Sequence, residues 1–495
     1  MLKTVYSIIA VCAIVSSNVW AQLPVKGKSG ATIDQLIKDK TLVTIVLKSN
    51  HTDINARLLS VDNTVLNYKG SDGNEHVFAI SSLKEVRVQT GKYREEESVL
   101  DLIVLSRDEK AVIQRAGAKA TEIFNQLKAS MDVPKPLLVQ AQAQNTYEYI
   151  LSLRMSAALV MALSGNNEGK VYLEEMMLNS DVDRAITAAS FYIYLDGEVP
   201  NQLIKTAFTN GDRIARATAA RIVGLTNNTN FNYILRKMSQ DPSPEIYPSA
   251  IRALGLLGDS ESIEQMYKGL ATLSQPKAEA AIYALAHMEN ENLIDYLYAR
   301  YRGTKGIEKL RILRLLYLLG DDDAINTIRD EGLRSLSYNK AFALTLAENS
   351  DWDGVNWIRE YMNEAIDPNM ENLFFQGYAA KAIYETTPNE ATKILQELVR
   401  ITPTQIYARG RTKDEAYKTM TAMFVHSNTC SIMGSLGDKK MMTVLSTKLH
   451  DENILVSLAA ADAIVKIITP DYRELSNKSE DFMGTRETLL QNFFK

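Results

Sequence analysis

The residues best suited to acid–base or metal chemistry are spread thinly along the 495-residue chain. The five histidines are His51, His76, His287, His426 and His450. No two of them are four residues apart and none is followed by glutamate, so the spacing of helical zinc sites is missing. The chain also has no nucleophile elbow, no P-loop and no dinucleotide-binding glycine motif. We therefore expect a protein that is not an enzyme and has no metal or other cofactor.

Two other groups offer chemistry of their own. Cys430 lies in an apolar helical stretch, which favours a small core residue over a reactive thiol. The run Asp321-Asp322-Asp323 follows Gly320 at a predicted turn between helices. Three carboxylates in a row can bind a cation, but at such a turn they are more typical of a helix cap exposed to solvent.

Composition excludes several classes of protein. The hydrophobic share is 46%, the charged share is 23% and the net charge is −5. These are the values of an ordinary soluble globular chain, and a nucleic-acid binder would be basic. Two cysteines exclude a disulfide framework and a cysteine-based zinc module. We expect a protein partner, no nucleic acid and no membrane insertion of the mature chain.

The first 21 residues have the pattern of a signal peptide. Lys3 precedes an apolar stretch from Val5 to Val15, and Val19-Trp20-Ala21 is a suitable cleavage site before Gln22. A membrane anchor is the alternative, but the apolar stretch is too short to span a bilayer. We expect cleavage after Ala21 and export to the periplasm or the extracellular space.

Residues 41–92 predict a small β module after a linker and short helix at 22–40. Val43, Ile45 and Leu47 alternate with polar residues, and turn signals such as Ser71-Asp72-Gly73-Asn74 separate five short strands. The texture V-x-I-x-L followed by A-x-L-x-x-V-D resembles an Sm-like or SH3-like small barrel. We infer no RNA binding from this resemblance, because the chain is predicted to be exported and no basic or asparagine-rich loop occurs. A connecting helix is predicted at 98–133, before Pro134.

From about residue 145 the chain repeats with a period of 31 residues. Each predicted unit begins with apolar residues at positions zero, +3 and +4, which share one helical face. A fixed period of this length predicts a solenoid of stacked helix pairs, because neither helix of a pair could bury its apolar face alone. Position zero is occupied by Ala157, Ala188, Ala219, Ala250, Ala281, Ile312 and Ala343.

The segment AIRALGLLGD carries a family resemblance. It resembles the first helix of a HEAT repeat, with the pattern A-x-x-A-L-G-x-L-G-D, and RATAARIVGL is a looser copy. The 31-residue period is similar to the HEAT-like repeats of the phycobilisome-lyase type. The fold expected is a mainly α protein, a right-handed α-solenoid of about ten two-helix HEAT-like repeats at 145–470. A small all-β barrel-like module precedes it, and residues 471–495 cap it.

Two stretches interrupt the period. ENLFFQG at 371–377 resembles the sequence cleaved to remove fusion tags, but Leu373 and Phe374 fit the helical pattern, so we expect a native helix. Residues 402–418 form the largest break and contain Arg409 and Arg411. Long insertions in repeat arrays often carry function, and a solvated loop is the ordinary alternative.

Two sets of repeated surface residues are candidates for binding a partner. Arginines stand two residues after position zero, about 200° from the buried stripe, and are expected to face solvent. The second helices are rich in large aromatics, and the HEAT resemblance implies that these helices line the concave face. Ordinary solvated surface is the alternative for both sets. The candidates are Arg221, Arg252 and Arg314 in the first set, and Tyr296, Tyr298, Tyr301, Trp357 and Tyr361 in the second.

These patterns favour an exported, non-catalytic scaffold or adaptor. It would bind another protein through the concave face of the solenoid, where aromatic and arginine side chains act as anchors. The alternative is an enzyme or a lyase-like accessory protein with its site in the 402–418 insertion or at the junction of the barrel with the solenoid. A perturbed carboxylate or histidine in a closed pocket would favour that alternative.

Overall fold

The chain divides into two compact units, Trp20–Ala118 and Lys119–Lys495. The structure is a computed structural model, and it describes residues 42–47, 52–61, 65–70, 72–79, 82–90, 95–98, 100–131, 141–195, 197–243, 245–271, 275–319, 321–329, 333–334, 339–363, 367–407 and 415–483. The predicted signal peptide at 1–21 and the predicted linker and short helix at 22–40 therefore lie outside the described residues. None of the described helices is long and apolar enough to cross a membrane.

The smaller unit contains a six-stranded antiparallel sheet in the order β4-β3-β2-β1-β5-β6. The alternating apolar residues Val43, Ile45 and Leu47 are buried, as the period of two predicts. The five strands predicted within 41–92 are present, and a sixth follows them. The strands are β1 (Leu42–Leu47), β2 (Thr52–Val61), β3 (Val65–Lys69), β4 (Glu75–Ala79), β5 (Leu83–Thr90) and β6 (Glu95–Ser98).

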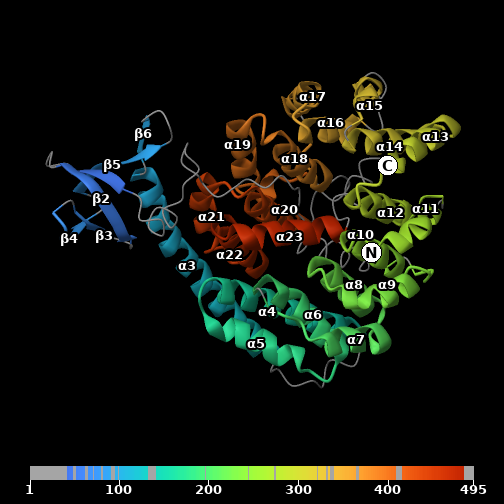
Figure 1. Ribbon diagram of the computed structural model, residues 1–495, viewed down its shortest axis with the longest axis horizontal. Helices are drawn as coiled ribbons and strands as arrows, with labels where there is room; N and C mark the ends of the chain where they lie inside the picture. The colour runs from blue at the N-terminus through green and yellow to red at the C-terminus, as the bar shows by residue number, and fades with distance from the viewer. Residues whose placement is uncertain are drawn as a thin grey trace. The chain divides into compact units, whose positions relative to one another are not determined.

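Helix α3 (Leu100–Met131) follows the sheet, and a helical solenoid follows α3. Its first helices lie side by side as an inner row, since α8 contacts α10, α10 contacts α12 and α20 contacts α22 (Figure 1). The inner row consists of α4 (Ala141–Leu163), α6 (Val182–Tyr192), α8 (Arg213–Leu225), α10 (Ile246–Leu256), α12 (Gln275–His287), α14 (Gly306–Leu318), α16 (Asn339–Glu348), α18 (Met370–Ile383), α20 (Glu415–Leu436) and α22 (Ile454–Ile468).

The second helices form the outer row of the solenoid (Figure 1). They are α5 (Asn167–Met177), α7 (Asn201–Asn210), α9 (Asn232–Met238), α11 (Ile263–Leu270), α13 (Asn292–Gly303), α15 (Asp322–Thr327), α17 (Trp352–Asn363), α19 (Pro388–Leu398) and α21 (Met442–Lys448). The last described helix, α23 (Pro470–Met483), follows α22. The prediction of about ten helix pairs is confirmed, because the described residues contain ten, from α4/α5 to α22/α23.

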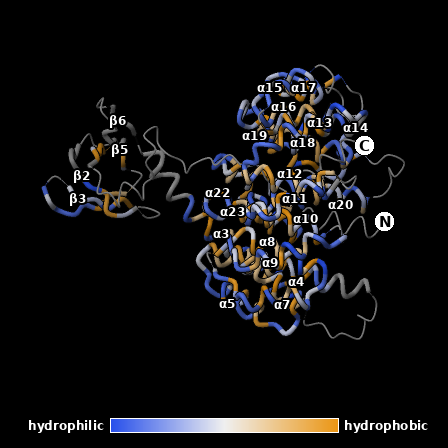
Figure 2. The backbone as a smooth tube through the Cα atoms, turned by 45° about the vertical axis from the view of Figure 1, so that its right-hand side comes forward, coloured by the Kyte–Doolittle hydropathy of each residue, from blue (hydrophilic) through white to orange (hydrophobic). Residues whose placement is uncertain are grey.

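The core of the solenoid lies between the two rows, with hydrophilic turns outside it (Figure 2). All seven residues predicted at position zero are buried, with at most 3% of their surface exposed. Neighbouring inner helices approach closely at glycine. A Cβ atom added to Gly255 would lie 2.4 Å from the Cα atom of Ala284 in the next repeat, and one added to Gly434 would lie 2.7 Å from that of Ala463. Small residues in the inner row therefore set the spacing of the repeats.

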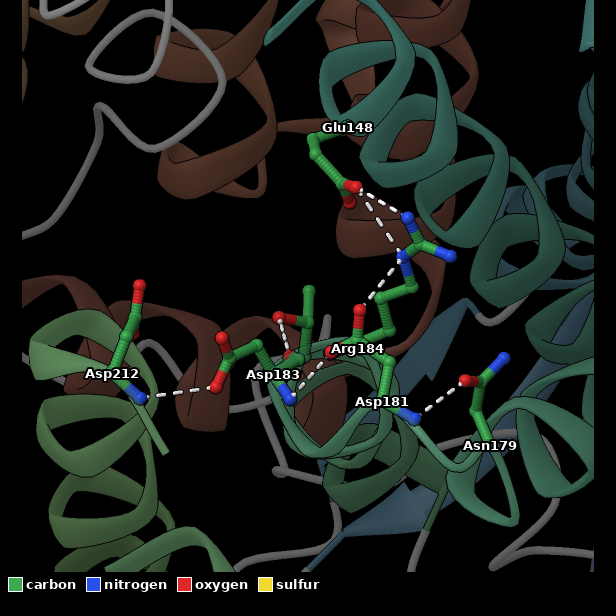
Figure 3. A network of polar contacts seen from close by, with 7 residues as sticks. Glu148, Asn179, Asp181, Asp183, Arg184 and Asp212 are labelled. Atoms are coloured by element: carbon green, nitrogen blue, oxygen red, sulfur yellow. Dashed lines mark hydrogen bonds and ion pairs between the residues drawn. The ribbon is translucent and has the colours of Figure 1, made fainter. Parts of the chain in front are cut away.

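Polar residues at the N-termini of the inner helices join the first three repeats (Figure 3). Asp181 caps α6 and Asp212 caps α8, and the two caps are one period apart. Arg184 pairs with Glu148 of α4 at 2.7 Å, and the backbone N–H of Asp212 donates to Asp183 at 3.1 Å. The second and third repeats thus each hydrogen-bond to the repeat before, as well as packing against it.

The solenoid closes on itself, because α22 contacts α4 of the first repeat. Helix α23 does not continue the outer row. It contacts α8, α10, α20 and the 3-10 turn η3 (Ile193–Leu195), so it lies against the inner row on the concave side (Figure 1). The concave side at α8, α10 and α20 is therefore occupied by α23, the last of the described helices.

Candidate interaction surfaces

Of the three arginines predicted to face solvent, two are buried and Arg221 is half-buried. Only 8% of Arg252 and 4% of Arg314 is exposed, and the Nε atom of Arg221 is buried. The helical position was assigned correctly, but that face of the inner row points into the closed ring. Arg314 donates from Nε to the hydroxyl of Thr345 in the next repeat at 2.8 Å. These side chains bridge repeats or meet α23, and the prediction of a solvent-facing stripe is wrong.

The second helices carry a polar ladder that repeats with the period of the array. Arg236, Tyr267, Tyr298 and Arg329 are each 31 residues apart. Each donates a hydrogen bond to an acidic or amide side chain in the turn that ends the next inner helix. The pairs are Arg236–Asp259, Tyr267–Asn290, Tyr298–Asp321 and Arg329–Asp351.

This ladder explains the carboxylate run at 321–323. Asp321 accepts from the hydroxyl of Tyr298 at 2.7 Å and from the backbone N–H of Ala324 at 3.1 Å, so it caps α15 and ties two repeats together. The hydrogen bond to Asp321, with burial adding to it, raises the pKa of Tyr298 to about 12. Tyr298, a predicted partner-binding residue, therefore holds neighbouring repeats together.

Asp259 is the most buried acceptor of the ladder, with 5% of its surface exposed. It accepts from Arg236 Nε at 2.9 Å, from Asn232 at 3.1 Å and from Ser262 at 2.5 Å. Burial alone would raise the pKa of Asp259, but the hydrogen bonds from Arg236 and Ser262 outweigh it, so the pKa lies below its usual value.

Replacing Asp259 by Ala should lower the free energy of unfolding by about 1–3 kcal/mol, because three donors lose their acceptor. Since the folded pKa is below the unfolded one, the carboxylate stabilises the fold above about pH 4 and ceases to do so as the pH falls further. The difference between wild type and Asp259→Asn in urea titrations should shrink below about pH 4. Glu261→Gln, at an exposed ion pair with the same Arg236, should change stability by less than about 0.5 kcal/mol. An equal effect of the two substitutions would contradict the ladder.

The aromatic residues predicted to line the concave face lie on the outer row instead. Tyr296, Tyr298 and Tyr301 belong to α13, and Trp357 and Tyr361 belong to α17. All five are half-buried. The aromatics lie outside because the first helices form the inner row. These first helices carry the small residues that close approach between neighbouring repeats requires.

Several of these aromatic rings contact one another. Trp357 stacks on Tyr361 with ring centroids 5.2 Å apart, and Tyr361 meets the buried Phe375 of α18 edge to face at 5.1 Å. The most exposed tryptophan side chain of the described residues is Trp352, at 53%, and the Arg359 guanidinium lies 5.5 Å from its ring centroid. Tryptophan and arginine are both enriched among interface anchors. Trp352 is one of the large aromatics predicted on the second helices, but it was not among the candidate partner-binding residues.

Residues 200–286 match the family model of HEAT repeats. Residues 200–286 are HEAT repeats, and the helix pairs on either side continue the same solenoid as HEAT-like repeats. Among solved structures, human deoxyhypusine hydroxylase in complex with glycerol is similar over 61% of this chain and 99% of that chain, with 14% identity and a TM-score of 0.27. At that score the likeness carries no argument about function. Among curated proteins, no sequence matches significantly. The phycobilisome-lyase type of repeat stays a prediction.

The histidines do not come together in the described part of the protein. His76 Nε2 is 3.1 Å from Asp72 on the small sheet, and His287 Nδ1 is 2.8 Å from the carbonyl of Tyr283. His426 Nε2 is 2.9 Å from the carbonyl of Ile401, and burial lowers the pKa of His426. Within the described residues, no three metal-binding side chains gather.

Three further predictions concern Cys430, the segment at 371–377 and the insertion at 402–418. Cys430 is fully buried, and burial raises the pKa of its thiol to about 12, as expected of a core cysteine. ENLFFQG belongs to native helix α18, whose cap Asn369 accepts from the N–H of Asn372. Arg409 and Arg411 lie outside the described residues; within the insertion, Pro403–Gln405 forms a 3-10 turn and α20 begins at Glu415.

Proposed function

We propose that this protein is an exported, non-catalytic scaffold that binds another protein through its HEAT array. The repeats support a role in protein interaction, because stacked helix pairs present an extended, preformed surface. The observation that carries the proposal is Trp352, a half-exposed tryptophan at the start of α17 with Arg359 beside it. Tryptophan and arginine are the residues most enriched among interface hot spots.

The contact surface that we propose runs along the outer row, around α17. Trp352 lies at the start of this helix, and Arg359 also pairs with Glu390 of α19 at 2.8 Å, so its guanidinium is held in place. A preorganised cation beside an aromatic ring loses little conformational entropy when a partner binds. Trp357 and Tyr361, which pack partly on α18, support this surface from within.

Replacing Trp352 by Ala should weaken partner binding by about 2 kcal/mol, roughly thirtyfold in Kd, while the melting temperature changes little because the side chain is half-exposed. Full-length tagged chains would be cross-linked in the cells that make them and the captured proteins compared by mass spectrometry. Leu178→Ala is the matched control, because Leu178 is an exposed apolar residue at the end of α5. A protein captured by the wild type and by the control, but lost with Trp352→Ala, is the expected result. Identical captured sets for all three chains would refute the outer-row surface.

Export rests on the N-terminal pattern of Lys3, the apolar stretch and Ala21. The mature protein purified from its native host should begin at Gln22. Intact-mass measurement of the purified chain tests this directly, and a full-length mass including Met1 would contradict export through signal cleavage.

A further inference from the structure

Helix α23 departs from the pattern of every other second helix in the described array. The others lie in the outer row and contact inner helices adjacent in sequence, whereas α23 crosses the concave side and contacts α8 and α10, which are far away in sequence. Arg221 and Met483, which touch there, are 262 residues apart. A helix that only capped the last repeat would not reach the third and fourth inner helices. Helix α23 therefore binds to a surface formed by distant repeats, in the way that a helix from another protein would.

Two aromatic side chains attach α23 to this face. Tyr472, near its start, meets Tyr194 edge to face with ring centroids 5.3 Å apart. Phe482, near its end, meets Tyr283 of α12 in the same manner at 6.3 Å. Both anchors are nearly fully buried, with 6% of Tyr472 and 1% of Phe482 exposed. The inner face thus offers two aromatic positions, spaced about ten helical residues apart.

The charges of the two sides are complementary. Lys466 of α22 lies 3.8 Å from Glu480 of α23. Lys381 of α18 is attracted by Glu480 and Asp481, but burial outweighs this attraction and lowers the pKa of Lys381 to about 8. Helix α23 thus brings carboxylates to two lysines of the inner face, and Lys466 also pairs with Asp462 of its own helix at 3.1 Å. Arg221 and Arg252 add two further cations to this face.

Arg221 is one of these cations, and α23 brings it a thioether instead of a carboxylate. Arg221 Nη1 donates to the Sδ atom of Met483 at 3.0 Å, and Arg221 Nε has no hydrogen-bond partner among the described residues. Burial lowers the pKa of Arg221, and no carboxylate offsets it. A thioether is a weak acceptor, so the cost of burying this guanidinium is left largely uncompensated.

The interface is also more polar than the core between the repeats. The buried side of α23 includes Ser476, Asn477 and Ser479. Asn477 reaches the carbonyl of Ser435 at 3.5 Å, and its Oδ1 atom has no hydrogen-bond partner in the described part of the chain. A surface with buried polar groups that are poorly matched is held less tightly than an apolar core. Helix α23 should therefore detach without unfolding the array.

We propose that the concave face is a receptor for an acidic, aromatic helix of a partner protein, and that α23 is the internal ligand that occupies it until such a helix displaces it. This proposal deepens the scaffold function, on which it rests, by naming a second surface and the chemistry of its ligand. A partner helix with a carboxylate in the place of Met483 would pair Arg221, whose desolvation has already occurred. That pairing is what allows a partner to compete with a tethered helix.

The test uses the full-length chain and two labelled peptides of residues 470–483, one native and one with Met483→Glu. Fluorescence anisotropy would measure their binding to the wild type and to Phe482→Ala, which loosens α23. The tethered helix has a high effective concentration, so the wild type should bind both peptides weakly. Phe482→Ala should bind the Met483→Glu peptide at least tenfold more tightly than the wild type does, and at least fivefold more tightly than it binds the native peptide.

The preference for the Met483→Glu peptide supplies a control. A purely structural role of Arg221 would not change this preference. Introducing Arg221→Gln into the Phe482→Ala chain should abolish the preference for the Met483→Glu peptide while keeping binding of the native one. Trp352→Ala, on the outer row, should leave peptide binding unchanged, which separates this proposal from the outer-row surface. Peptides that bind neither chain, or equally well with and without Phe482→Ala, would overturn the proposal.

Hydrogen exchange of the wild type supplies a second readout that needs no variant. Amides of α23 should exchange at least tenfold faster than those of α22 and α10, because α23 opens without the array. Exchange of α23 in step with α22 would show a single cooperative unit and contradict the displaceable helix.

Discussion

Replacing Ala253 by Asp should unfold the centre of the HEAT array. Ala253 is fully buried in α10, and the backbone of the preceding repeat approaches it so closely that a Cβ atom added to Gly224 would lie 3.0 Å from its Cα. An aspartate there places an unpaired charge between packed helices, which costs about 3–5 kcal/mol. Since each repeat is stabilised by its neighbours, the loss should spread from α10 to α8 and α12.

Circular dichroism and hydrogen exchange measure this effect together. We expect a lower melting temperature, loss of helical signal and faster amide exchange in three adjacent repeats. Ala299→Asp is the control, because the substitution is identical but Ala299 is exposed on α13. It should cost only a few tenths of a kcal/mol through helix propensity. Unchanged melting of Ala253→Asp would show that the assigned register is wrong.

The architecture of the solenoid was predictable because it depends on small and apolar residues that recur at a fixed, short spacing in the sequence. Inner helices approach closely only where small residues recur, and the recurrence of Ala219, Ala250 and Ala281 at 31 residues is visible without a structure. The β module was predictable for the same reason, since alternation with period two is short-range. Its sixth strand, Glu95–Ser98, was missed because its sequence, EEES, has no apolar alternation and resembles a loop.

The burial of the arginines could not be predicted, because it depends on contacts between distant parts of the chain. Helical geometry places Arg221 opposite the stripe that packs between the rows, and in an open solenoid this face meets water. Closure of the ring by α22 against α4, and the inward course of α23, put it inside the molecule instead. The sequence near residue 221 gives no indication that Arg221 contacts Met483, a residue 262 positions away.

The predicted position of the outer aromatics on the concave face was wrong for a different reason, and their role in binding a partner stays a prediction. Tyrosine and tryptophan stabilise both interfaces and repeat contacts, so residue type alone does not separate the two roles. The 31-residue spacing of Arg236, Tyr267, Tyr298 and Arg329, opposite acidic or amide turns, was a signal that could have identified the structural ladder. Trp352 has no counterpart at that spacing, which is consistent with a role other than joining repeats.

Replacing Gly255 by Ala should destabilise the array, although only a methyl group is added. The added Cβ atom would lie 2.4 Å from Ala284 Cα and 3.0 Å from Ala284 O, which are backbone atoms and cannot rotate away. Helices α10 and α12 would have to separate, and overpacking of this kind costs about 1–3 kcal/mol. In an ordinary helix the same substitution stabilises by roughly 0.5–1 kcal/mol, so the expected sign is reversed.

Gly303, at the end of α13, provides the matched comparison, because a Cβ atom added there meets nothing within 4 Å. Gly303→Ala should therefore leave the melting temperature unchanged or raise it slightly. Urea denaturation of the two variants, measured by circular dichroism, gives the free energies directly. If Gly255→Ala were as stable as Gly303→Ala, the close approach of α10 and α12 would not set the spacing of the repeats. The two substitutions thus separate glycine required by contact between helices from glycine that merely ends one.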